Sequence, residues 1–303
     1  MPPSPRRYEL LKTRIDRFTR MLPGVEEGDV HAIHGARVAS RRLRELLPML
    51  QLDHDTTRKL ERRLRKVTRR LGPVRELDVL LPLIDELHES RRGGERALKH
   101  VADAVRLARG AAQGEVAGKT AAAELRRVSR KLESAAKILE KADTRPSTRG
   151  WQWALEARVA RRASALRAAI DAAGSVYLPE RLHAVRIALK KLRYGVELWL
   201  EAGGSKENAD LRRLKRSQEL LGQLHDRHVL ITHVRREQAA LAPSGIAPSD
   251  TKVWSELDAL ITSVENNCRV LHARYVRDRA MLISLCDRLA TRSDRGEAAR
   301  RAG

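Results

Sequence analysis

Two stretches of this chain, half a chain apart, place basic side chains on one face of a helix. Residues 183–193 read HAVRIALKKLR, and residues 34–44 read HGARVASRRLR at a constant offset of 149 residues. At about 100° per residue, the histidine, the two arginines and the first lysine of the later stretch fall within an arc of about 80°. Leucine and valine take the opposite side. A helix with one cationic face and one core face, present twice, predicts a single site built from two halves.

The rest of the sequence is also patterned for helices. Ala, Leu, Arg and Glu dominate, apolar residues recur at every third or fourth position, and strand signals are weak. We expect Pro23 and Gly24 to close the first helix, Asp29 to cap the second, and Pro48 to kink the last turn of the second. The expected helices are residues 6–22, 30–52, 56–90 with an interruption at Gly72 and Pro73, 95–142, 151–173, 181–203, 206–240 and 250–290. Three glycines in the element at 95–142 leave open that it bends or splits. Those before residue 144 resemble those after residue 150.

A second pair of segments repeats at an offset of 150 residues. The sequence LERRLRKVTRRLGPVREL from residue 60 aligns with DLRRLKRSQELLGQLHDR from residue 210. Both segments carry a cationic face, although Glu219 stands where the first has Arg69. The pattern predicts an all-α protein of two four-helix bundles from an internal repeat. The expected divisions are residues 1–145, residues 146–291 and a flexible polar tail at 292–303, with TRPSTRG at 144–150 as the linker.

Together the paired segments resemble the CHAD domain, the conserved histidine α-helical domain, over about residues 6–290. Two H-x-x-R-x-x-x-(R/K)-(R/K)-x-R helices, each followed by an L-x-R-x-L-(R/K)-(R/K) segment that ends in LG, carry the resemblance. It implies two four-helix bundles related by a pseudo-twofold axis, with a basic central surface that binds inorganic polyphosphate. It also implies localisation to polyphosphate granules. Some family members accompany a triphosphate-tunnel catalytic domain, but no residues remain here for its β-barrel.

The charge balance independently indicates a polyanionic partner. Lys and Arg number 61 against 39 Asp and Glu, which gives a formal net charge of +22. Nucleic acid, an anionic membrane or polyphosphate would each fit such an excess. Aromatic residues make up only 3% of the chain, which weighs against stacking of splayed bases. We therefore expect polyphosphate as the partner, nucleic acid only as a non-specific partner, and no membrane.

The cationic faces supply the candidate binding residues. Neither basic stretch contains an acidic residue, whereas a merely solvated helix face normally interleaves acids at i+4. Arginine also grips phosphate oxygens with its planar fork. The expected polyphosphate-binding residues are His34, Arg37, Arg41, Arg42, Arg44, Arg62, Arg65, Lys66, Arg69, His183, Arg186, Lys190, Lys191, Arg193, Arg212, Lys215 and Arg216.

The histidines allow three interpretations. His34 and His183 could be packed or capping residues, hydrogen-bond donors to phosphate, or metal ligands. Their central place in each cationic arc favours donation to phosphate. Histidines also recur at i, i+3 in residues 31–34 and 225–228, but no cysteine or carboxylate completes either pair. We expect no metal and no cofactor.

Three further charged residues follow the LG segments, namely Arg75, Asp78 and Asp226, and we interpret them as structural. The four tryptophans are expected in the core.

No carboxylate cluster lies on a cationic face and no Gly-rich phosphate loop is present, so we expect a protein that is not an enzyme. A nucleic-acid backbone binder and, less favoured, a phosphoanhydride hydrolase remain the alternatives. Oligomeric state is not indicated.

Cysteine usage and hydropathy suggest a compartment. Cys268 and Cys286 lie on one expected helix, about 27 Å apart at 1.5 Å per residue, which is too far for a disulfide between them. A reducing compartment fits this pattern. The N-terminus lacks an apolar run typical of a signal peptide, and no stretch approaches 18 apolar residues. We expect a cytoplasmic protein.

Overall fold

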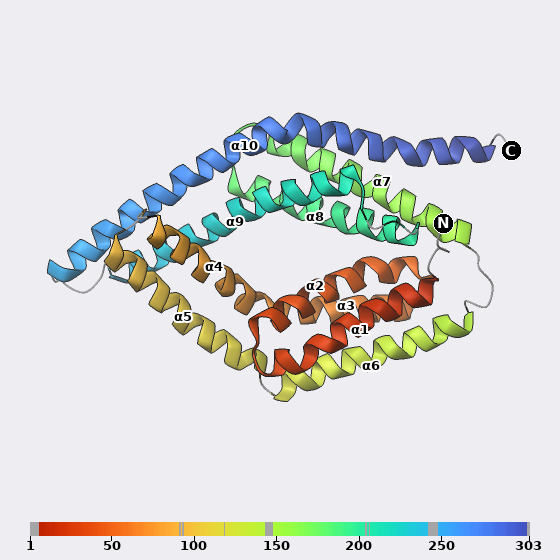
Figure 1. The fold of residues 1–303 in the computed structure, drawn as a ribbon, viewed down its shortest axis with the longest axis horizontal. Helices are drawn as coiled ribbons and strands as arrows, with labels where there is room; N and C mark the ends of the chain where they lie inside the picture. The colour runs from red at the N-terminus through yellow and green to blue at the C-terminus, as the bar shows by residue number, and fades with distance from the viewer. Residues whose placement is uncertain are drawn as a thin grey trace.

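The computed structural model describes residues 6–90, 92, 94–117, 119–142, 148–203, 205, 207–241 and 248–301. Over these residues the chain is helical and forms no strand, so the predicted all-α class is confirmed (Figure 1). The helices of the first half are α1 (Arg7–Glu26), α2 (Val30–Leu46), α3 (His54–Arg70), α4 (Gly72–Glu89), α5 (Glu95–Ala117) and α6 (Lys119–Ala142). Those of the second half are α7 (Thr148–Ala173), α8 (Pro179–Ala202), α9 (Ala209–Leu241) and α10 (Pro248–Arg301).

Local sequence explains most helix ends. The Asp29 side chain accepts a hydrogen bond from the Ala32 N–H at 2.6 Å and caps α2, as expected. Pro48 ends α2, and the chain continues as the short 3₁₀ helix η1 (Leu47–Met49). The expectation that α1 ends at Pro23 is wrong. The helix runs through this proline because the fully buried Val25 keeps its last turn against the core, and Gly28 then turns the chain at φ 76°.

The two halves differ in where their helices break. The segment expected as one element at 95–142 forms two helices, α5 and α6, whereas its counterpart α10 is continuous. Similarly, α3 and α4 are separated at Leu71, whereas α9 runs without a break. The helix α10 continues to Arg301, beyond the tail start expected at residue 292. Most of the expected linker at 144–150 and of the expected loop at 241–249 lies outside the described residues.

Three hydrophobic cores hold the helices together. The first lies among α1, α2, α3 and α6. The second lies among α7, α8, the first part of α9 and the second part of α10. The third joins α4 and α5 of the first half to the remaining parts of α9 and α10. The division near residue 145 therefore separates the sequence repeats but not the cores, because the third core mixes both halves.

The halves also meet at a second place. Leu198 and Ala202 of α8, and Trp151 and Leu155 of α7, pack into the first core. In Figure 1, α4 and α5 meet α9 and α10 at one end, and α2 and α8 face each other across the middle. The space between α2, α4, α8 and α9 is thus bordered by contacts between the halves at both ends.

The tryptophan and cysteine expectations have mixed outcomes. Trp151 is buried and Trp199 is partly buried against the core, as predicted, but Trp153 and Trp254 are 40% and 43% exposed. The core prediction is therefore wrong for these two tryptophans.

Cys268 and Cys286 are free and buried in different cores, which confirms that they do not pair. Within the described chain, no helix is both long and apolar enough to cross a membrane.

Candidate functional site

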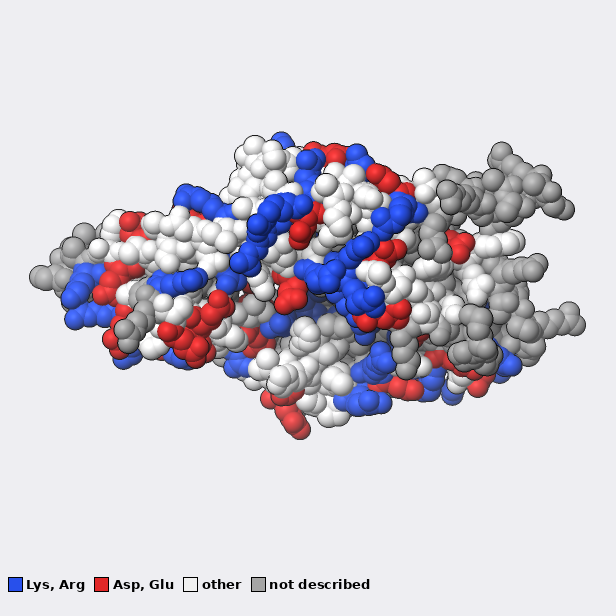
Figure 2. Space-filling model, turned by 45° about the horizontal axis from the view of Figure 1, so that its top comes forward, with Lys and Arg blue, Asp and Glu red and all other residues white. Residues whose placement is uncertain are grey.

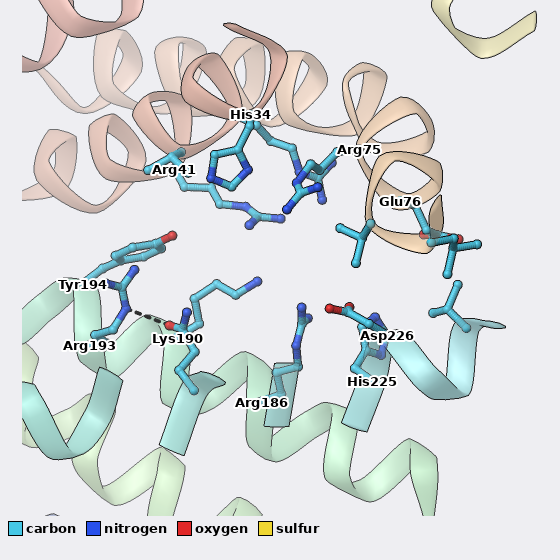
Figure 3. A pocket seen from close by; sticks show the side chains of 16 residues that line it. His34, Arg41, Arg75, Glu76, Arg186, Lys190, Arg193, Tyr194, His225 and Asp226 are labelled. Atoms are coloured by element: carbon cyan, nitrogen blue, oxygen red, sulfur yellow. Dashed lines mark hydrogen bonds between the residues drawn. The ribbon is translucent and has the colours of Figure 1, made fainter. Parts of the chain in front are cut away.

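A cavity of about 340 Å³ lies between α2, α4, α8 and α9, and we call it the central pocket (Figure 3). Helix α2 contributes two arginines, α4 one, and α8 two arginines and a lysine, and all face the cavity. Two carboxylates, two histidines, a tyrosine and a glutamine complete its polar wall. The polar residues that line it are His34, Arg37, Arg41, Arg75, Glu76, Arg186, Lys190, Arg193, Tyr194, Gln218, His225 and Asp226.

Equivalent positions of the two halves face each other across this pocket. Arg37 and Arg41 of α2 correspond, at the offset of 149, to Arg186 and Lys190 of α8. At the offset of 150, position 75 corresponds to 225 and position 76 to 226, and all four side chains line the same cavity. The internal repeat therefore supplies both walls of one pocket.

Packing between α2 and α3 orients Arg37, one of the two arginines that α2 contributes to the pocket. Arg37 Nη1 donates to the Thr68 carbonyl at 3.1 Å, and the Thr68 hydroxyl is 2.9 Å from that of Ser40 in a buried contact. A Cβ at Gly72 would lie 3.0 Å from Arg37 Nη1. The glycine that begins α4 thus leaves room for the guanidinium at the pocket wall.

The cations of the pocket are close together and partly desolvated. Burial, with nearby Arg41 and Arg75, lowers the pKa of Arg37 to about 10. Burial, with Arg41 and Arg186, lowers the pKa of Lys190 to about 7. The buried Nε of Arg186 has no hydrogen-bond partner among the described residues. Like charges held together in this way are destabilising until an anion joins them.

Two carboxylates also reach the pocket, from α4 and α9. Burial raises the pKa of Asp226, against the lowering effect of Arg186 and Arg75. Glu76 is exposed at the rim. Arg75 and Asp226, interpreted from the sequence as structural residues, both line the cavity, and their structural role stays a prediction. It is confirmed for Asp78, whose buried carboxylate accepts from Arg109 Nε at 2.6 Å.

The histidines lie at the solvent-accessible edge of the site. His183 lines a smaller cavity of about 220 Å³ beside His225 and His228, and its Nδ1 is 3.4 Å from Nδ1 of His225. Burial and the nearby cations lower the pKa of His34 and bring that of His225 to about 3. Among the described residues, no group of three or more His, Cys, Asp and Glu is placed to hold a metal ion. Donation to phosphate by His34 and His183 stays a prediction.

A third cavity, of about 320 Å³, lies where α2 meets the end of α8, and acids neutralise its cations. Glu197 accepts from Arg42 at 3.3 Å and from Arg193 at 2.5 Å, and so links the two halves. Glu201 similarly binds Arg14. Acidic residues outside the two basic stretches thus balance their C-terminal ends. Arg42 of α2 pairs with Glu197 across to α8, and Arg193 pairs with the same carboxylate within α8.

The remaining expected binding residues lie away from the central pocket. Lys66 pairs with Glu124 and Lys215 with Glu207, while Lys191 lies beside Arg162 on another part of the surface. The expected residues that do not line the central pocket are Arg42, Arg44, Arg62, Arg65, Lys66, Arg69, His183, Lys191, Arg212, Lys215 and Arg216. Figure 2 shows lysines and arginines around a hollow near the middle of the molecule, whereas basic and acidic side chains are interleaved toward its end.

Sequence reasoning missed half of the polar wall. Arg75, Glu76, Tyr194, Gln218, His225 and Asp226 line the pocket but were not among the expected binding residues. The repeat offered a signal, since 75 and 76 align with 225 and 226 and all four positions carry ionisable groups. A pair of charged positions kept in both copies of a repeat favours a shared site over two separate structural ion pairs.

Comparison with known proteins places the fold. The crystal structure of the CHAD domain from the plant Ricinus communis matches with a TM-score of 0.54 and 21% identity, over 85% of this chain and 90% of that chain. PptA from Streptomyces chartreusis matches with a TM-score of 0.52 and 19% identity, over 95% and 98%. No curated protein matches the sequence. The family model of the CHAD domain matches residues 9–235, and the chain therefore belongs to the CHAD-domain family.

Proposed function

We propose that this protein binds inorganic polyphosphate in the central pocket, with both halves contacting the same chain. The observation that carries the proposal is the convergence of cations from α2 and α8. Arg41, Arg186 and Lys190 point into one cavity, and no described acidic side chain lies at ion-pair distance from any of them (Figure 3). Phosphate oxygens would supply the missing negative charge, and arginine forks would bind them with two hydrogen bonds each.

The shape of the site favours a linear polyanion. The central pocket shares Arg186 and His225 with the histidine-lined cavity, so the two cavities adjoin along α8. The third cavity adjoins the central pocket at Tyr194, but glutamates already neutralise its cations, so the path does not extend into it. A flexible chain of phosphates can occupy such a path, and each phosphate bound raises the effective concentration of the next.

Nucleic acid fits the same site less well. A nucleic-acid duplex is too large to enter a cavity of about 340 Å³ and would have to bind on an open surface or groove. Single strands usually stack their bases on aromatic rings, and the central pocket contains a single aromatic side chain, Tyr194, already covered by the Arg193 guanidinium at 4.4 Å. The features of the pocket thus support phosphate recognition without base recognition.

We further propose that the protein does not cleave the chain and instead brings itself, or a partner, to polyphosphate granules. The two carboxylates that line the pocket lie among five arginines, and these arginines compete with Mg²⁺ for the carboxylate oxygens. Incubation with Mg²⁺ or Mn²⁺ should leave polyphosphate length unchanged. Protein-dependent shortening that one point substitution abolishes would overturn the absence of catalysis.

A competition experiment tests the binding proposal. Labelled long-chain polyphosphate is displaced by unlabelled polyphosphate, duplex DNA or RNA of equal total charge at moderate salt. We expect polyphosphate to compete best, and its affinity to fall steeply as salt rises, because binding releases counterions. Equal or better competition by either nucleic acid would show that the pocket is not selective for polyphosphate and would contradict the proposal.

A further inference from the structure

Lys190 occupies an unusual place among the cations of the central pocket. It extends from α8 into the cavity, opposite Arg41 of α2 (Figure 3). Charged and titratable groups face it from all four helices. They are His34, Arg37 and Arg41 of α2, Arg75 and Glu76 of α4, Arg186, Arg193 and Tyr194 of α8, and His225 and Asp226 of α9.

None of the acids near Lys190 is placed to balance its charge. Glu197, one turn beyond the pocket, already accepts from Arg42 and Arg193. Glu76 is exposed at the rim, and Asp226 makes no ion pair with the lysine. Arginines keep their charge in proteins, whereas a lysine releases its proton when it is desolvated beside other cations. Lys190 is thus the pocket cation most able to relieve the repulsion.

Burial moves the two pocket histidines away from the pH range in which Lys190 changes charge. Burial brings the pKa of Lys190 to about 7. The pKa of His34 is lowered from its ordinary value, and that of His225 lies at about 3, so both imidazoles are already neutral at the pH where Lys190 titrates. Above neutral pH, Lys190 therefore loses its charge before Arg37, whose pKa burial lowers only to about 10.

We propose that polyphosphate binding is coupled to the uptake of one proton by Lys190, so that the protein holds the chain more tightly at neutral than at alkaline pH. This coupling rests on the proposed function. Binding brings phosphate oxygens beside the amine and so favours its charged form. The bound chain therefore raises the affinity of Lys190 for its proton, and by reciprocity the proton raises the affinity for the chain.

The direction of the effect follows from the two protonation states. Below the pKa of the empty protein the lysine is charged with or without ligand, and affinity does not depend on it. Above that pKa, each binding event must take up a proton. The dissociation constant then rises by up to about tenfold per pH unit, until the pKa of the bound state is reached.

The test measures the affinity for long-chain polyphosphate between about pH 7 and about pH 9, above the range to which burial lowers the pKa values of His34, His183 and His225. Long chains are used because only terminal phosphates titrate near neutral pH. Wild type should lose about tenfold in affinity per pH unit, and Lys190→Arg, with a fixed charge, should bind with little pH dependence. Lys190→Gln should bind weakly at every pH. Lys191→Arg, at the neighbouring exposed lysine, is the matched control and should follow wild type.

Calorimetry in buffers of different ionisation enthalpy provides a second readout. Wild type should take up close to one proton per bound chain at about pH 8, and Lys190→Arg close to none. Equal pH slopes or equal proton uptake in wild type and both Lys190 variants would overturn the coupling while leaving polyphosphate binding intact. Absence of polyphosphate binding by wild type at any pH would overturn the proposed function itself, and the coupling with it.

Discussion

The two halves of the chain place side chains at matching positions of the central pocket but use different chemistry there. The first half presents Arg41 and Arg75, whose charge is permanent, where the second half presents Lys190 and His225, which can lose theirs. Burial lowers the pKa of Lys190 to about 7 and that of His225 to about 3. The repeat therefore places the pocket side chains at matching positions, and the differences between the copies underlie the pH response that we propose for the second-half wall.

The backbone differs between the halves at the same helix positions. The first half breaks at Leu71, between α3 and α4, and the second runs through the equivalent position within α9. A Cβ at Gly72 would meet Arg37 Nη1 at 3.0 Å, whereas a Cβ at Gly222 would meet nothing within 4 Å. Only at the first glycine would a Cβ crowd a side chain of the pocket. Two positions that align in sequence can thus carry different structural constraints.

The largest loss of polyphosphate affinity is expected when a charge is reversed inside the pocket. Reversal of a charge on the exposed face of α3, in the same half of the chain, should have a much smaller effect. Arg41→Glu should weaken binding of long-chain polyphosphate by about 100-fold or more, because it replaces a charge-assisted hydrogen bond with repulsion. Arg62→Glu, on the exposed face of α3, should cost less than about threefold, since screened surface charges contribute little. Equilibrium binding at fixed salt measures both, with circular dichroism as the control for folding. Similar losses in the two variants would move the site from the pocket to the outer basic surface.

An intermediate effect is expected from the two pocket carboxylates, which differ in burial. Asp226→Asn removes a partly buried negative charge from a cationic cavity and should tighten polyphosphate binding by about tenfold. Glu76→Gln, at the exposed rim, should tighten it by about threefold or less. Affinities measured at two salt concentrations would distinguish the two variants. The gain in affinity from Glu76→Gln should decrease strongly as salt rises, whereas the gain from Asp226→Asn should not. Weaker binding in Asp226→Asn would mean that the carboxylate helps to hold the ligand.

The smallest effect is expected from the two aligned glycines. Gly222→Ala should stabilise the protein by up to about 1 kcal/mol, because alanine is favoured over glycine in a helix interior and the site is open. Gly72→Ala should bring no such gain and should lower polyphosphate affinity, because its methyl group crowds Arg37. Thermal unfolding and binding assays on both variants measure the difference. An equal gain in stability with unchanged affinity in Gly72→Ala would remove the proposed constraint.

Helix-level features of this fold could be read from the sequence, because helical periodicity and caps are local. The amphipathic pattern predicted the helix regions up to residue 290, and Asp29 and Pro48 marked ends that the structure shows. The end of α10 lies beyond the predicted range. The run of α1 through Pro23 was missed because it depends on the tertiary contacts of Val25. The third core was missed for a related reason. It joins α4 and α5 to segments of α9 and α10 far away in sequence, and no local pattern specifies that pairing.

The candidate site was predictable in part for the same reason. The faces of α2 and α8 that reach the pocket could be assigned from periodicity, because each helix has one apolar side that must face a core. Periodicity does not show which basic residues meet an acid from another helix. Arg193 meets Glu197 four residues further along the same helix, a pairing that the sequence itself indicates, but only the fold brings Arg42 of α2 to that carboxylate. Arg75 and Asp226 lie beyond the LG segments, and their orientation depends on how α4 and α9 pack.

The central claim is that the two halves form one polyphosphate site, and a titration of single-half variants tests it most directly. Long-chain polyphosphate is titrated into wild type, Arg41→Glu and Arg186→Glu, with stoichiometry and affinity measured together. The account predicts that either variant, although altered in one half only, loses high-affinity binding in the whole population, because the second contact is intramolecular. Retention in both variants of a class of sites with wild-type affinity and reduced stoichiometry would show two independent sites and would contradict the account.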